Sequence, residues 1–139
     1  MASKKYKEDF ILFAEAGFIA VNQADEDAAL KLFKAAELLD PKNILPKIGF
    51  GYLHLHKLEL KQAVKCFDEV LEIDPRNDMA KAFKGLSLSM MPNSVDKGEQ
   101  ILEETLKSKD PAIKQLAGSA IDFVEKFIKK NPGPASKSK

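Results

Sequence analysis

The chain has 139 residues, of which 45% are hydrophobic, enough to build one continuous core without disulfides or metal ions. Its 22 Lys and Arg residues nearly balance 21 Asp and Glu residues, so the net charge of +1 gives no field that recruits nucleic acid or an anionic membrane. The lone Cys66 excludes an internal disulfide and suits a reducing cytoplasm, where we expect the protein to act. Charged residues interrupt the apolar runs, so we expect neither a signal peptide nor a membrane span.

A period of 34 residues organises most of the chain. Sliding the sequence by this period superposes small, aromatic and Asp-Pro positions: Gly17 on Gly51 and Gly85, Ala29 on Ala63, Phe33 on Phe67, and Asp40-Pro41 on Asp74-Pro75. Each unit holds two apolar stripes at helical spacing, which predicts a helical hairpin. Glycine inside a helix costs about 1 kcal/mol relative to alanine, so we expect the second helix to approach closely at these glycines. The phenylalanines are expected to fill the space between adjacent hairpins, and the Asp-Pro pairs to end the second helices.

The period predicts hairpins over 10–43, 44–77 and 78–110, within one domain spanning 1–130. In the third hairpin, with helices expected over 78–91 and 95–108, one inserted residue is needed before later positions match. With that insertion Gly98, Leu102 and Thr105 take the second-helix places.

Asp110 and Pro111 predict the N-cap and first turn of a seventh helix over 111–130, which closes the repeat stack. Its apolar residues are predicted to share one buried face: Ile113, Leu116, Ala117, Ala120, Ile121, Val124, Phe127 and Ile128. Residues 131–139 are rich in Pro, Ser and Lys and are predicted to be disordered. The expected fold class is all-α, three helical hairpins and a closing helix.

The spacing of Gly, Ala, Phe and Pro resembles the tetratricopeptide repeat over about residues 10–110. This resemblance implies a right-handed superhelix whose first helices line a concave groove that binds peptides or helices. The small three-repeat chain and the segment 108–114 (SKDPAIK) also resemble type III secretion chaperones that hold needle subunits before export. That resemblance implies a cytoplasmic chaperone that sequesters an amphipathic helix of a secreted client, with a second small co-chaperone as a further possible partner. Related chaperones of translocator proteins share the architecture.

The first-helix positions that hairpin packing leaves free are mostly apolar. They are Ile11, Ala14, Phe18 and Val21 in the first hairpin, Leu45, Ile48, Tyr52 and Leu55 in the second, and Met79, Ala82 and Leu86 in the third. We predict that they line the groove, with Phe18, Ile48 and Tyr52 contacting a client helix, because contiguous apolar patches mark interaction sites. The alternative is that the closing helix and neighbouring hairpins cover them.

No catalytic, cofactor or metal site is predicted, and the protein is not expected to be an enzyme. His54 and His56 are two residues apart, so on a helix they point in different directions. Cys66 has no histidine near it in sequence, and Gly49 and Gly51 lack the lysine that follows in a phosphate-binding loop. The remaining hypotheses are a needle-subunit chaperone, a translocator chaperone, or a self-associating scaffold whose groove a second copy fills.

Overall fold

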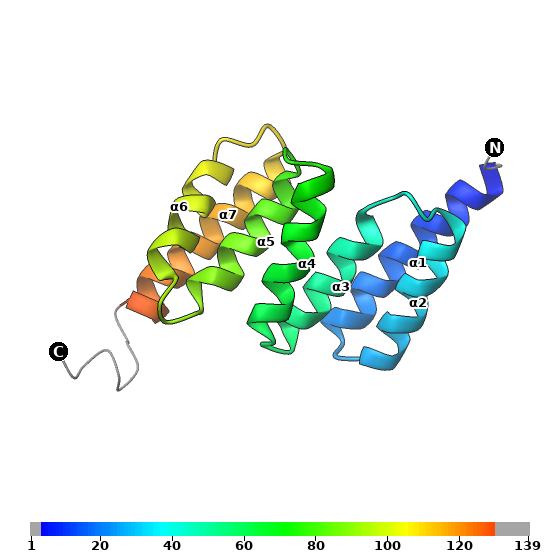
Figure 1. Ribbon diagram of the computed structural model, residues 1–139, viewed down its shortest axis with the longest axis horizontal. Coiled ribbons are helices and arrows are strands. Elements are labelled where there is room, and N and C mark those ends of the chain that lie inside the picture. The colour runs from blue at the N-terminus through cyan, green and yellow to red at the C-terminus, as the bar shows by residue number, and fades with distance from the viewer. Residues whose placement is uncertain (1–3, 130–139) are drawn as a thin grey trace. The chain divides into compact units, whose positions relative to one another are not determined.

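The computed structural model describes residues 4–129, which form seven α-helices and a final π-helical segment, with no strand among them. In chain order the helices are α1 (Lys4–Asn22), α2 (Glu26–Leu39), α3 (Leu45–His56), α4 (Leu60–Ile73), α5 (Asp78–Ser89), α6 (Val95–Thr105), α7 (Pro111–Phe123) and the π-helix η1 (Val124–Lys129). The helices α1 and α2, α3 and α4, and α5 and α6 pair as hairpins (Figure 1). The predicted all-α class built from helical hairpins is confirmed.

Packing divides the chain into two compact units, unit 1 over Met1–Ile73 and unit 2 over Asp74–Lys139. Unit 1 holds α1 to α4, and unit 2 holds α5 to η1. The single domain over 1–130 and the right-handed superhelix stay predictions, and the predicted disorder over 131–139 lies outside the described residues. None of the helices in the described part is long and apolar enough to cross a membrane.

One phenylalanine ring joins three helices of unit 1. Phe33 of α2 is fully buried, and a Cβ atom at Gly17 of α1 would lie 2.5 Å from its Cε1. A Cβ atom at Gly49 of α3 would collide with the same ring. In the second hairpin, a Cβ atom at Gly51 would lie 2.6 Å from Cε1 of Phe67. These contacts confirm that the glycines admit a close approach and that Phe33 fills the space between the first two hairpins.

The third hairpin follows the predicted one-residue insertion. A Cβ atom at Gly85 of α5 would lie 3.0 Å from Cγ of Leu102, which therefore takes the place of the phenylalanines. Gly98 takes the place of Ala29 and Ala63, and a Cβ atom there would lie 2.6 Å from the carbonyl oxygen of Gly85. A methyl group at Gly98 would collide with backbone atoms of α5, so α6 requires glycine there, whereas a methyl group at Gly85 would make a tight contact.

Polar side chains cap the starts of three helices, and the cap at Asp110 was predicted from the sequence. The side chains of Asp25, Asn77 and Asp110 accept hydrogen bonds from the first-turn amides of α2, α5 and α7. Asp110 accepts from the Ala112 amide at 2.9 Å, and Pro111 follows it in the first turn, as predicted. The helices α2 and α4 both end one residue before an Asp-Pro pair, which confirms that proline stops them.

The last helix departs from the predicted continuous α-helix over 111–130. Its α-helical part ends at Phe123, and the following turn has the wider i→i+5 hydrogen bonding of a π-helix. Four residues are buried as predicted: Ile113, Ala117, Ala120 and Val124. Phe127 is 59% exposed, so its predicted place on the buried face is wrong. The wider turn rotates it beside Phe123, with ring centroids 5.5 Å apart.

Candidate functional site

An open cavity of about 420 Å³ lies within unit 1, where α1 meets the end of α2 and the start of α3. It is lined by Tyr6, Lys7, Phe10, Ile11, Leu39, Asp40, Asn43 and Leu45. The cavity follows from the repeat register. Ile11 and Leu45 are equivalent at the 34-residue offset, yet α1 begins at Lys4 whereas α3 begins at Leu45. Beside the first turns of α1, the place that α3 would take is therefore occupied by the loop 40–44.

The walls of the cavity are apolar and its loop is internally bonded. Phe10 is buried, and Leu39 and Leu45 pack against the core cluster that it forms with Ala14 and Ala36. The Asn43 amide donates to the Asp40 carboxylate at 3.3 Å, and its Oδ1 accepts from the backbone amide of Leu45 at 2.9 Å. The loop polar groups thus bond one another. The cavity offers apolar surface, with the Lys7 ammonium as the positive charge in its lining.

Phe18 and Tyr52 meet at the junction of the first two hairpins. Their ring centroids are 5.5 Å apart, and Phe18 also packs edge-on against Phe33 at 5.2 Å. The Tyr52 hydroxyl donates to Oδ1 of Asn22 at 2.6 Å. Burial raises the pKa of Tyr52, and the hydrogen bond with Asn22 partly opposes this shift. Both rings are half-buried, so part of each stays accessible to solvent, and their contact joins α1 to α3.

The eleven residues predicted to line a groove differ in accessibility. Five are buried: Ala14, Val21, Ile48, Leu55 and Ala82. Five are half-buried, Phe18, Leu45 and Tyr52 in unit 1 and Met79 and Leu86 on α5 in unit 2. Ile11 is 52% exposed. The cavity brings Ile11 and Leu45 together, and ring contact brings Phe18 and Tyr52 together. Whether any of these residues contacts a partner stays a prediction.

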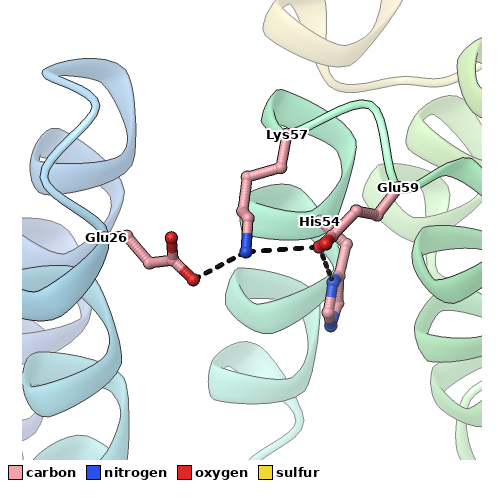
Figure 2. A network of polar contacts seen from close by, with 4 residues as sticks. All are labelled: Glu26, His54, Lys57 and Glu59. Carbon is pink, nitrogen blue, oxygen red and sulfur yellow. Dashed lines mark hydrogen bonds and ion pairs between the residues drawn. The ribbon is translucent and has the colours of Figure 1, made fainter.

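A network of four charged and polar side chains links the start of α2 with the turn between α3 and α4 (Figure 2). Lys57 Nζ lies 2.6 Å from Oε1 of Glu26 and 3.5 Å from Oε1 of Glu59, which in turn lies 2.8 Å from Nδ1 of His54. The hydrogen bond that Lys57 donates to Glu26 raises the pKa of Lys57, and the hydrogen bond with His54 lowers the pKa of Glu59. Sequence reasoning missed this network, because Glu26 and Lys57 are 31 residues apart.

A second charged cluster lies in unit 2. Glu99 of α6 is 7% exposed, and its Oε1 lies 2.5 Å from the Lys129 ammonium of η1. Lys129 also pairs with Glu125 at 3.4 Å. Burial raises the pKa of Glu99, while the hydrogen bond from Lys129 opposes the shift. The sequence pattern did not single out Glu99, because a charged residue on a helix is usually exposed, whereas Glu99 is buried on α6.

The histidine and cysteine side chains that could carry chemistry have defined surroundings in the structure. No group of three or more His, Cys, Asp or Glu side chains within residues 4–129 could hold a metal ion. His54 pairs with Glu59, whereas His56 is exposed and packs its ring on Tyr52 at 4.7 Å. Cys66 is half-buried, and burial raises the pKa of its thiol, so the reactive thiolate is disfavoured at neutral pH.

Comparison with known proteins identifies neither a family nor a related structure for this chain. No protein-family model, no curated protein and no solved structure matches the chain. The likeness to tetratricopeptide repeats and to secretion chaperones therefore rests on the 34-residue period and the short segments that carry it.

Proposed function

We propose that the protein is a chaperone that binds an amphipathic helix of a client protein on the face of unit 1 formed by α1 and α3. The cavity between these helices carries the proposal. Two apolar residues from equivalent places in the two hairpins, Ile11 and Leu45, line it together. An open apolar cavity in a protein surface is a place where a large apolar side chain of a partner becomes desolvated.

The same face continues from the cavity to the aromatic pair. Ile11 and Phe18 are seven residues apart on α1, as are Leu45 and Tyr52 on α3, so each pair lies on one helix face two turns apart. Two turns of helix rise about 10.5 Å, which is also the spacing of side chains at i and i+7 on a client helix. A client helix along this face therefore places one apolar side chain in the cavity and a second against the Phe18 and Tyr52 rings.

Energetics require both contacts. One well-buried apolar side chain contributes about 1.5–3 kcal/mol, whereas association costs about 4–15 kcal/mol. The cavity alone is thus insufficient, and the aromatic pair supplies part of the remainder. Lys7 and Asp40 bring opposite charges to the cavity lining, so the apolar contacts, and not a net charge, favour binding at the cavity.

The proposed client is a type III secretion needle subunit held in the cytoplasm before export, on the resemblance of residues 108–114 and of the small repeat chain to such chaperones. A client that polymerises through an apolar helix stays monomeric while that helix is occupied, and mass action sets the protected fraction. A translocator chaperone and a scaffold filled by a second copy are the alternatives.

A matched pair of variants tests the proposal. Ile11 and Leu12 are sequence neighbours with similar exposure, 52% and 59%, but Ile11 lines the cavity and Leu12 does not. The tagged protein is purified from its native host, the bound protein is identified by mass spectrometry, and its amphipathic helix is titrated as a synthetic peptide. A small secreted subunit is expected. A large membrane-active protein favours the translocator alternative, and recovery of the chain alone favours the scaffold.

Ile11→Glu should weaken binding of that peptide by more than about tenfold, because the carboxylate replaces apolar wall surface and the client side chain would have to desolvate it. Leu12→Glu should bind as the wild type does, and both variants should keep the wild-type helical content by circular dichroism. Equal binding by Ile11→Glu and the wild type, or equal losses in both variants, would show that the client does not use the cavity.

A further inference from the structure

The outer face of α1 matches a covered face of α3. At the 34-residue offset, Leu12, Glu15 and Ile19 of α1 are equivalent to Pro46, Gly49 and Leu53 of α3. On α3 these positions are buried, because α2 packs over them: Leu53 belongs to the core cluster around Phe33, and Gly49 touches the Phe33 ring. On α1 the equivalent positions are open.

The exposed fractions show how open this face is. Leu12 is 59% exposed and Ile19 is 56% exposed, and Glu15 between them is exposed as well. Residues three, four and seven apart share one helix face, so the three side chains form one stripe. The helix α1 packs against α2 and α3 (Figure 1), and the exposure of the three residues shows that neither helix covers them. The outer face of α1 therefore matches the surface of α3 on which α2 packs, but no helix within the described residues covers it.

We propose that this outer face of α1, defined by Leu12, Glu15 and Ile19, docks an amphipathic helix of a second protein in the way that α2 packs on α3. The surface is separate from the cavity, since none of its three residues lines the cavity. It goes beyond the proposed client site and does not depend on it.

The middle residue specifies the chemistry of the docked helix. On α3 a glycine admits the Phe33 ring, but on α1 the same place holds Glu15. The docked helix therefore carries a lysine or arginine there, because a charge opposite Glu15 is favourable whereas an apolar ring would desolvate it. Leu12 and Ile19 call for an apolar side chain on either side, about 10.5 Å apart.

A second copy of this chain fits the face poorly. A two-fold pair of outer faces brings Glu15 of one copy toward Glu15 of the other, which repels. The chain's own α2 carries no basic residue at the matching place, which is Phe33, and that ring is fully buried between Gly17 and Gly49. The charge and the existing packing both favour a different protein as the occupant.

A synthetic peptide tests this chemistry. The probe is the segment 25–43 of this chain, which contains α2 with its own N-cap, labelled with fluorescein and carrying Phe33→Lys. Titration with the full-length protein, followed by anisotropy, should give saturable binding. A second peptide carrying Phe33→Glu should bind at least about tenfold more weakly. Against the protein variant Glu15→Lys, the order of the two peptides should reverse.

Protein variants locate the binding. The double variant with Leu12→Glu and Ile19→Glu should bind the lysine peptide at least about tenfold more weakly. Leu38→Glu is the matched control, because Leu38 is an 82% exposed leucine on α2, and it should bind as the wild type does. Ile11→Glu should also bind the peptide normally, so loss of the client site and loss of this face are separable.

Three results would overturn the proposal. The first is an absence of saturable binding by the lysine peptide, and the second is equal binding of the lysine and glutamate peptides. The third comes from sedimentation: a wild-type dimer that Leu12→Glu and Ile19→Glu dissociate would make a second copy the occupant of the face.

Discussion

Gly17→Ala tests the close packing of unit 1, and we expect it to destabilise the protein although alanine is the better helix former. Gly17 lies inside α1, where alanine in place of glycine is worth about 1 kcal/mol in helix propensity. The new Cβ atom, however, would lie 2.5 Å and 2.7 Å from two carbon atoms of the Phe33 ring. Ordinary contacts lie at 3.4–4 Å, so one of the groups must move.

The ring has little freedom to move. Phe33 has no exposed surface, and Gly49 of α3 lies against its other side. Inserting a methyl group into a packed core costs about 1–3 kcal/mol, and a ring held from two sides places the cost near the upper end. After the gain in propensity is subtracted, the expected net loss in the free energy of unfolding is about 2 kcal/mol.

Urea unfolding followed by circular dichroism measures the loss, and Gly118→Ala is the control. A Cβ atom at Gly118 of α7 would lie 3.7 Å from Leu106, an ordinary contact, so this variant should gain about 1 kcal/mol. In a Phe33→Leu background the cost of Gly17→Ala should fall by at least about 1 kcal/mol. If Gly17→Ala is as stable as Gly118→Ala, or if the cost is unchanged beside leucine, the ring does not limit the approach of the helices.

Two further predictions concern polar contacts of unit 1. The pKa of Glu59 lies below its ordinary 4.5, so the contacts of its carboxylate stabilise the fold above that pH and are lost as pH falls through the lower folded-state pKa. Glu59→Gln should therefore lose less stability on acidification below pH 4.5 than the wild type does. If the melting temperatures of the two proteins fall in parallel as the pH is lowered, this prediction is wrong. Tyr52→Phe removes the hydrogen bond to Asn22 and should cost about 0.5–1.5 kcal/mol in urea unfolding. Adding Asn22→Ala to Tyr52→Phe should lower the free energy of unfolding little further, because the hydrogen bond is already absent. If the losses of the two single variants add up in the double variant, the hydrogen bond does not contribute to stability.

The repeat period predicted the hairpins because each residue type that recurs at the 34-residue offset has a role in packing. Gly17 and Gly51 could be assigned to close approach since nothing else compensates glycine inside a helix. The inserted residue of the third hairpin could be placed because Leu102 must occupy the position of Phe67, and the contact of Leu102 with Gly85 confirms it. Helix ends followed from Asp110 and the Asp-Pro pairs, which act locally.

Other features depend on three-dimensional contacts that one sequence does not display. Ile48 reads as a free first-helix position, yet it is 2% exposed, because hairpin packing covers more of the helix than two stripes indicate. The place of Phe127 changes with the π-helical turn, for which the sequence carried no recognised signal. The pairing of Glu26 with Lys57 joins different hairpins at exposed positions, where apolar periodicity is uninformative.

The two apolar surfaces of α1 also differ in how readily they could be found. Ile11 belonged to the predicted groove, and the structure adds the cavity that it lines with Leu45. Leu12 and Ile19 were not singled out, although the offset to Pro46 and Leu53 was already present in the sequence. The missing information was that α2 covers Leu53, which only the packed hairpins reveal.

Photo-crosslinking tests the central claim, that a client helix lies on the face formed by α1 and α3 over the cavity. A benzophenone amino acid replaces Ile11 or Leu45 at the cavity, or the exposed Leu38 as a control, and the protein is irradiated in its native host. One client should crosslink from positions 11 and 45, through an amphipathic helix identified by mass spectrometry, and not from position 38. Equal crosslinking from position 38, or no client crosslink from either cavity position, would contradict the account.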